Sequence, residues 1–179
     1  MKLTTIIAIP ALFILFSCSK PSNPTPTVNT GTTSGSNNNT GITVVKTQSI
    51  NNTYTLGTSS SSYATYTATL GGEEKTTYNG SNIYTLLIED GSGNALEFWF
   101  TQKPGAGTYQ VTNAANSPIP SGGVSVITTV NGGYLSIGTG SVIVGVNGDG
   151  SYTVTATSIT LQNTTATAVL LLNASVNIP

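Results

Sequence analysis

Residues 82–101 read NIYTLLIEDGSGNALEFWFT, two apolar runs joined by a segment of Gly, Ser, Asn and Asp. In the second run Leu96, Phe98 and Phe100 occupy every other position, the period of two that predicts a β-strand with one apolar face. The first run is apolar at nearly every position, so we expect a strand that is covered on both faces. Residues 90–94 predict a hairpin between the two strands, because Gly, Asn and Asp accept the left-handed backbone of tight turns.

The same pattern recurs along the chain from residue 41 onward. Short runs rich in Thr, Val, Ile and Tyr alternate with Gly and Asn, and no stretch has the 3.6-residue periodicity of an amphipathic helix. We therefore expect an all-β domain, an antiparallel β-sandwich of roughly nine to eleven strands. A closed or half-open β-barrel of the lipocalin type is the alternative. Further strands are expected at residues 63–70, 108–111, 124–130, 134–137, 141–146, 151–162 and 166–178, with further hairpins at 131–133 and 147–150.

One of these strands changes the phase of its apolar residues. They fall on even positions from Tyr152 to Ala156 and on odd positions at Ile159 and Leu161. A regular strand keeps all such residues on one face only if the alternation is unbroken. The change of phase predicts a bulge or bend near Thr157-Ser158.

Two further expectations concern where strands end and how they are covered. Gly71-Gly72 is expected to end the strand at 63–70, which would leave Glu73-Glu74 in a solvated loop. Residues 168–172 are continuously apolar, which predicts a central strand covered on both faces.

Charge is scarce, since charged residues make up 6% of the chain. From residue 41 onward three lysines face six acids, a formal charge of −3, and the chain has neither arginine nor histidine. Nucleic acids and anionic membrane surfaces require clustered cations, so neither is an expected partner. Metal sites built on His or Cys are excluded as well, and no cofactor is expected.

Few residues could support catalysis. Without histidine the usual serine triad lacks its base, and the spacing favours none of Lys46, Lys75 and Lys103 as the base of a Ser–Lys pair. The acids could form the carboxylate pair of a glycoside hydrolase, although such enzymes usually need a larger cleft. Glu73-Glu74 is expected in a solvated loop and Glu89-Asp90 at the end of a strand, so Glu97 is the most notable of these acids. We expect a non-catalytic domain, with a carboxylate-based hydrolase as the exception.

Trp99 is the only tryptophan of the chain. Alternation places it on the strand face opposite Phe98 and on the same face as Glu97. An aromatic ring beside a carboxylate on the polar face of a sheet suits the stacking of a sugar ring, so Trp99 and Glu97 are the candidate ligand-binding residues. The alternative is that Trp99 packs under a loop or in the second layer of the sandwich, because large aromatic side chains are mostly buried.

The first 17 residues fit a secretory signal, with one positive charge, an apolar run too short to span a bilayer and small residues before Cys18. Leu15-Phe16-Ser17-Cys18 resembles the lipobox of bacterial lipoproteins. The resemblance implies that Cys18 becomes the N-terminus and carries a diacylglycerol on its thiol and usually an acyl chain on its amino group. Several acyl chains would hold the protein stably at a membrane. Ser19 replaces the Asp that often retains such proteins in the inner membrane, which indicates the outer membrane and leaves periplasmic or surface exposure open.

The chain is thus expected to have three parts: a signal peptide at 1–17, the lipidated Cys18 with a disordered tether to residue 40, and one all-β domain at 41–179. The tether is rich in Ser, Thr, Asn and Pro and cannot bury enough apolar surface to fold. This plan resembles the small outer-membrane lipoproteins of Gram-negative bacteria that carry one β domain of unknown function. Residues 63–72 and Gly107-Thr108-Tyr109 are similar in style to those domains.

Three functions are compatible with these features. The first is a non-catalytic binding or adhesion module at the outer membrane, for a glycan bound near Trp99. The second is a structural or accessory subunit of a cell-envelope complex, with an apolar patch or sheet edge that a partner covers. The third is a lipocalin-like carrier of a small apolar ligand, which requires a cavity instead of a filled core.

Overall fold

The computed structural model describes residues 43–58, 62–115 and 118–179. The expected signal peptide, the lipidation of Cys18 and the tether therefore lie outside the described residues. The described part forms ten strands and one short 3-10 turn. In chain order they are β1 (Thr43–Gly57), β2 (Tyr63–Tyr78), β3 (Ser81–Glu89), β4 (Ala95–Phe100), β5 (Gly107–Val111), β6 (Gly123–Thr128), η1 (Val130–Gly132), β7 (Tyr134–Ser136), β8 (Ser141–Val146), β9 (Tyr152–Asn163) and β10 (Val169–Ile178).

The fold is all-β, as the sequence predicts, and the strand number lies within the expected range. Every strand that the pattern predicted is present, with ends shifted by a few residues or, for β2, extended. Within the residues described, no helix has the length and apolar character needed to cross a membrane.

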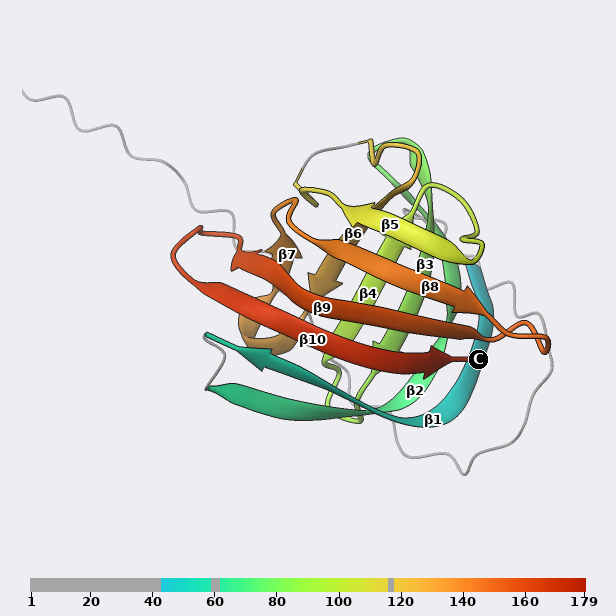
Figure 1. The fold of residues 1–179 in the computed structure, drawn as a ribbon, viewed down its shortest axis with the longest axis horizontal. Coiled ribbons are helices and arrows are strands. Elements are labelled where there is room, and N and C mark those ends of the chain that lie inside the picture. The colour runs from blue at the N-terminus through green and yellow to red at the C-terminus, as the bar shows by residue number, and fades with distance from the viewer. Residues whose placement is uncertain (1–42, 59–61, 116–117) are drawn as a thin grey trace, which may run out of the picture. The chain divides into compact units, whose positions relative to one another are not determined.

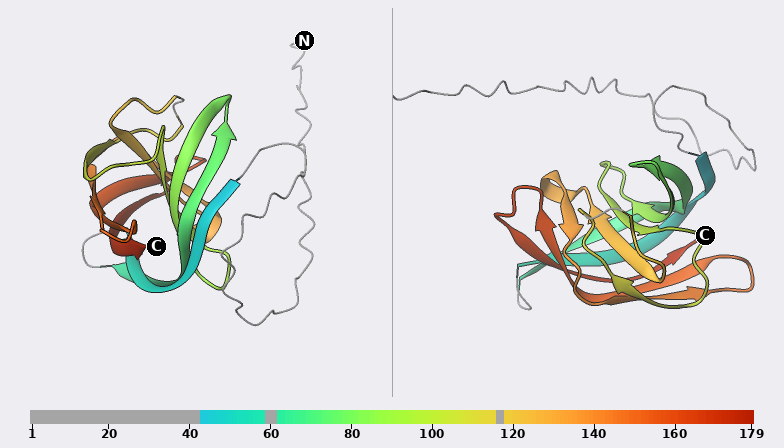
Figure 2. Two further views of the ribbon diagram at one scale, coloured as in Figure 1. Left: turned by 90° about the vertical axis from the view of Figure 1, so that its right-hand side faces the viewer. Right: turned by 90° about the horizontal axis from the view of Figure 1, so that it is seen from above.

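All ten strands belong to one sheet, in the order β10-β1-β2-β3-β4-β6-β5-β8-β9-β7. β10 lies between β1 and β9, through antiparallel pairs such as Leu56 with Leu172 and Leu161 with Leu170. The sheet thus folds over on itself, and β8, β9 and β10 cross in front of β3, β4 and β6 (Figure 1). Figure 2 shows the same two layers from the side. The architecture is sandwich-like, with both layers belonging to one continuous sheet.

The hydrophobic core fills the space between the layers. Alternate residues of each strand point inward, and β4 shows this most simply, since Leu96, Phe98 and Phe100 are buried while Glu97 and Trp99 are half-buried on the outer side. The opposite layer contributes apolar side chains from β8, β9 and β10, which pack into the same cluster. β3 is buried from residue 83 to residue 88, as its apolar sequence predicted.

The predicted bulge is present in β9. Ile159 pairs with Leu172 and Ala156 with Ala174, so two residues of β9 face one residue of β10. Ser158 takes a left-handed backbone (φ 52°), and its N–H donates a 2.8 Å hydrogen bond to Oδ1 of Asn173. The bulge keeps the apolar residues on both sides of it in the core.

The expectation that Gly71-Gly72 ends a strand is wrong. β2 continues through both glycines to Tyr78, paired with β1 on one side and β3 on the other. A Cβ on Gly72 would collide with the carbonyl oxygen of Lys46 in β1, so glycine serves here for close backbone approach. Glu73 is consequently buried in the strand instead of exposed in a loop.

Two other strands differ from expectation. β1 was not predicted, because its polar sequence lacks regular apolar alternation. The segment 168–172 was expected to be covered on both faces, yet Val169 is exposed and only Leu172 is fully buried. The first residues of β10 pair with β9 alone, because the pairing with β1 begins at Leu171, so this segment starts at an open edge and not in the centre of the sheet.

Candidate functional site

The β2–β3 hairpin and β4 position the candidate site. Asn79 and Gly80 form the turn between β2 and β3 with positive φ angles of 48° and 76°, the conformation that an Asn-Gly hairpin turn requires. The turn fixes the register in which Lys75 faces Tyr84 and Thr77 faces Asn82. β4 continues this register, because Tyr84 also faces Phe100.

Trp99 lies on the outer face of this sheet, as alternation predicted. Its indole N–H donates a 2.6 Å hydrogen bond to Oε2 of Glu97, two residues away on the same face. Tyr78 packs edge-on against the Trp99 ring, with ring centroids 5.3 Å apart. We call Tyr78, Glu97 and Trp99 the outer aromatic patch. Two aromatic rings and one carboxylate thus meet on a single sheet face.

Two carboxylates near this patch have raised pKa values. Burial raises the pKa of Glu97, the hydrogen bond from Trp99 opposes that rise, and the charge of Glu89 adds to it. The pKa of Glu74 is also raised, first by burial and then by the charges of Glu97 and Glu89. Glu74 and Glu97 are therefore both poorly solvated, and the charge of Glu89 acts on each of them. Among the described residues no group of three or more His, Cys, Asp or Glu side chains could hold a metal ion.

The patch offers two kinds of interaction to a ligand. The half-buried indole and the exposed Tyr78 ring supply apolar faces beside polar tips. Glu97 fixes the orientation of the Trp99 ring through Oε2, and its other oxygen accepts no hydrogen bond from the described residues. A ligand with C–H faces and hydroxyl groups matches both features.

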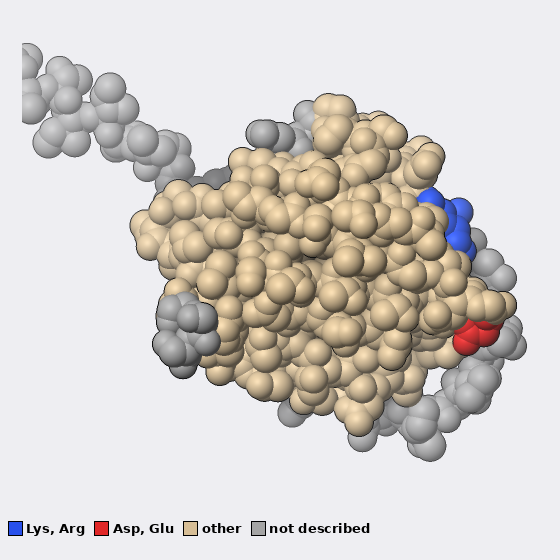
Figure 3. Space-filling view, viewed as in Figure 1, with Lys and Arg blue, Asp and Glu red and all other residues tan. Residues whose placement is uncertain are grey.

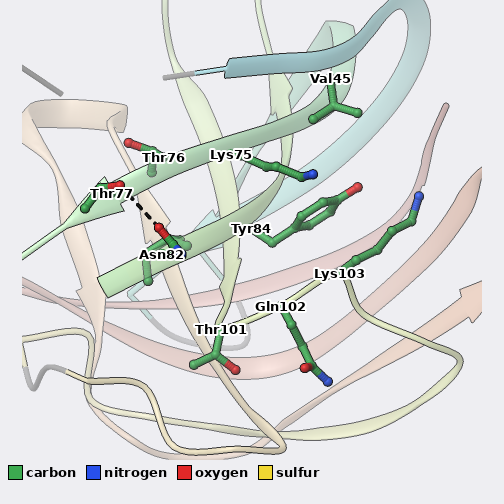
Figure 4. Close-up of a pocket in the computed structure, with 10 residues that line it drawn as sticks. Val45, Lys75, Thr76, Thr77, Asn82, Tyr84, Thr101, Gln102 and Lys103 are labelled. Atoms are coloured by element: carbon green, nitrogen blue, oxygen red, sulfur yellow. Dashed lines mark hydrogen bonds between the residues drawn. The ribbon is translucent and has the colours of Figure 1, made fainter. Parts of the chain in front are cut away.

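A pocket lies at the end of the β2–β3 hairpin, and we call it the end pocket. Its volume is about 530 Å³. Val45 of β1 covers one side, the two strands of the hairpin form the floor, and the segment 101–103 that follows β4 closes the other side (Figure 4). The remaining lining residues are Lys75, Thr76, Thr77, Asn82, Ile83 and Tyr84.

Lys103 at this pocket is held by a buried carboxylate. Its ammonium lies 3.4 Å from Oε2 of Glu73, whose side chain is 4% exposed, while the Lys103 side chain itself is 61% exposed. The ammonium also sits 5.9 Å from the Tyr84 ring centroid and 5.7 Å from that of Tyr152. The Tyr152 hydroxyl and then Glu73 raise the pKa of Lys103, against partial desolvation. Lys103 therefore serves to neutralise Glu73, since a buried carboxylate needs a counter-charge.

Charges on the folded domain are unevenly placed. The face formed by β8, β9 and β10 is almost free of them, and the few visible lie at one edge (Figure 3). Lys46 is opposite Glu73 in the β1–β2 pairing and lies close enough to lower the pKa of Asp149, behind hydrogen bonds from Ser151. The lysines at 46, 75 and 103 thus gather at the end that holds the pocket.

Sequence reasoning identified part of this arrangement. It placed Trp99 and Glu97 together, and the structure brings them into hydrogen-bond contact. It missed Tyr78, although the Asn-Gly turn directly after it is a strong hairpin signal. It also missed the end pocket, because no local pattern shows that Lys75 and Lys103 lie near Tyr84. The tight loops at Asp90 and Asp149 are hairpin turns whose carboxylates accept backbone N–H groups.

The chain matches no protein-family model, no curated protein and no solved structure. The geometry of its own residues is therefore the basis for any functional statement.

Proposed function

We propose that this chain is a lipid-anchored outer-membrane lipoprotein whose β domain is a non-catalytic carbohydrate-binding module. The anchor is the lipid on Cys18 that the lipobox resemblance implies. The domain binds neutral glycan through the outer aromatic patch and needs no cofactor. The domain faces the compartment that contains its glycan, either the periplasm or the cell exterior.

One observation supports the binding function above the others. The single tryptophan of the chain lies on the outer face of the sheet, beside the Tyr78 ring and tied by its N–H to Glu97. A ring whose rotamer is already fixed loses little entropy when a ligand stacks on it. A ligand that stacks on Trp99 therefore binds with a small loss of side-chain entropy.

The emission of Trp99 tests this proposal directly, because no second tryptophan contributes. The full-length chain would be titrated with soluble dextran, xylan, mannan and β-glucan. We expect at least one of them to shift the emission and protect Trp99 from acrylamide. Retention in affinity electrophoresis on that polysaccharide should be lost in Trp99→Ala and weakened in Tyr78→Ala.

The matched control is Tyr63→Ala, which removes a half-buried tyrosine from the start of β2. It should leave retention unchanged. Equal retention of Trp99→Ala and the unsubstituted chain, or no response to any of the four polysaccharides, would contradict the proposal.

Membrane anchoring is tested separately. Cys18→Ser should move the protein from the membrane fraction to the soluble fraction and abolish incorporation of labelled palmitate. Ser19→Ala keeps the cysteine and serves as the control. A Cys18→Ser protein that stays with the membrane would refute the lipid anchor and leave the glycan proposal untouched.

A second candidate is supported by the face formed by β8, β9 and β10. This face carries exposed Ile143 and Val169 and almost no charge (Figure 3). Such a surface suits contact with another envelope protein. Ile143→Asp should then abolish co-purification of a partner after cross-linking in cells. The carrier function finds less support, because side chains of both layers fill the interior.

A further inference from the structure

The end pocket contains a polar group without a partner. Tyr84 is 3% exposed, yet its hydroxyl makes no hydrogen bond with any of the described residues. A buried hydroxyl without a partner is costly, so native structures rarely leave one unsatisfied. Tyr84 is one of the residues that line the end pocket (Figure 4).

Two lysines share the pocket with this hydroxyl. Lys75 faces Tyr84 across the β2–β3 pairing, and Lys103 lies over the Tyr84 ring. In Figure 4 the polar ends of all three side chains point to the same side of the pocket. Lys103 already neutralises Glu73, whereas no carboxylate of the described residues lies within ion-pair distance of Lys75. The pocket therefore holds one uncompensated positive charge.

The rest of the lining is neutral and able to form hydrogen bonds. Gln102 and Asn82 supply amides, and Thr101 and Thr77 supply hydroxyls, with Thr77 donating a 3.4 Å hydrogen bond to Asn82. Val45 and Ile83 add apolar surface. A volume of about 530 Å³ is within the range of small-molecule sites. The matching ligand carries one anionic group, several hydroxyls and a compact body.

We propose that the end pocket binds a sugar acid of the hexuronate type, with its carboxylate on Lys75 and the Tyr84 hydroxyl and its ring hydroxyls on the amides and threonines. Lys103 lends its remaining donors to the same carboxylate while it stays paired with Glu73. The site consists of residues other than those of the outer aromatic patch. This proposal can therefore be tested independently of glycan binding at that patch.

The test is isothermal titration calorimetry of the full-length chain with D-glucuronate. D-glucose, which keeps the ring without the charge, and acetate, which keeps the charge without the ring, are the reference ligands. We expect glucuronate to bind and both references to bind at least tenfold more weakly, since a hydrogen bond to a charged group is worth about that factor. Binding should weaken as salt rises. A comparison of galacturonate with trigalacturonate tells a free sugar acid from a chain end, because the two ligands differ only in length.

Two variants probe the two groups that carry the proposal. Lys75→Gln removes an exposed charge, and Tyr84→Phe removes only a hydroxyl that has no partner among the described residues. Each should raise the glucuronate Kd about tenfold without lowering the unfolding midpoint. Lys46→Gln is the matched control, because Lys46 lies at the same end of the domain and outside the pocket lining.

The results separate this site from the proposed function. Trp99→Ala should bind glucuronate as the unsubstituted chain does, so loss of neutral-glycan binding leaves this inference intact. The proposal is overturned if glucuronate gives no heat, if glucose binds as tightly as glucuronate, or if Lys46→Gln weakens binding as much as Lys75→Gln.

Discussion

At the scale of single residues, Glu97 links the stability of the domain to pH. Its side chain bears a carboxylate in a poorly solvated position, held by one hydrogen bond from Trp99. Because burial raises its pKa in the folded state, the folded chain binds this proton more tightly than the unfolded chain. The stability it contributes is present below the ordinary carboxyl pKa of 4.5 and is lost as pH rises through the raised value.

We therefore expect the urea midpoint of unfolding to fall as pH rises above 4.5, because a carboxyl group with a raised pKa ionises there in the folded chain. Glu97→Gln keeps an acceptor for Trp99 and removes the charge, so it should flatten this profile and be at least as stable near neutral pH. Glu74 retains part of the slope, because its pKa is also raised.

Asp149→Asn is the control for this profile. Hydrogen bonds from Ser151 lower the pKa of Asp149, so this acid is ionised throughout the same range. Its replacement should leave the slope as it is. A profile in Glu97→Gln that is as steep as in the unsubstituted chain would show that Glu97 is well solvated.

At the scale of elements, local sequence pattern predicted most strands and their inward faces. The bulge in β9 was predictable because a single change of apolar phase has few structural solutions. Hairpins were predictable because their backbone angles require Asn, Asp or Gly.

β1 was not predicted, because its polar sequence forms a strand through pairing with β2 and β10. The end pocket was not predicted for the same reason, since Lys103 meets Glu73 only through the fold.

The bulge itself gives a prediction at this scale. Asn173→Ala removes the side-chain oxygen that accepts the Ser158 N–H. The left-handed residue then loses its support, and the free energy of unfolding should fall by about 1 kcal/mol, the net worth of one hydrogen bond. Urea denaturation followed by circular dichroism measures this change.

Thr157→Ala provides the comparison, because Thr157 is the exposed partner residue of the same bulge. Its effect should stay within about 0.5 kcal/mol, as for most surface substitutions. Equal losses in both variants would show that the Asn173 side chain does not support the bulge.

At the scale of the whole domain, β10 holds the two layers together. It pairs with β1 on one side and β9 on the other, and Leu172, Val176 and Ile178 from it are fully buried. A chain that ends at Asn163 lacks these contacts and leaves the edges of β1 and β9 open. We expect that chain to lose its cooperative unfolding transition in thermal melts.

Removal of Pro179 alone is the control, because this residue follows β10 and takes no part in the strand pairing. The shortened chain should melt within a few degrees of the full chain. A cooperative melt in the chain that ends at Asn163 would mean that the other nine strands form a self-sufficient fold.

The position of β10 also bears on the order of events during biosynthesis. Asn52 in β1 exchanges hydrogen bonds with the backbone of Asn177, 125 residues later. β1 therefore cannot pair with β10 until the ribosome has made the 125 residues that separate Asn52 from Asn177. Contacts of such large separation form slowly. Closure of the sheet by β10 is therefore expected to be a late step of folding.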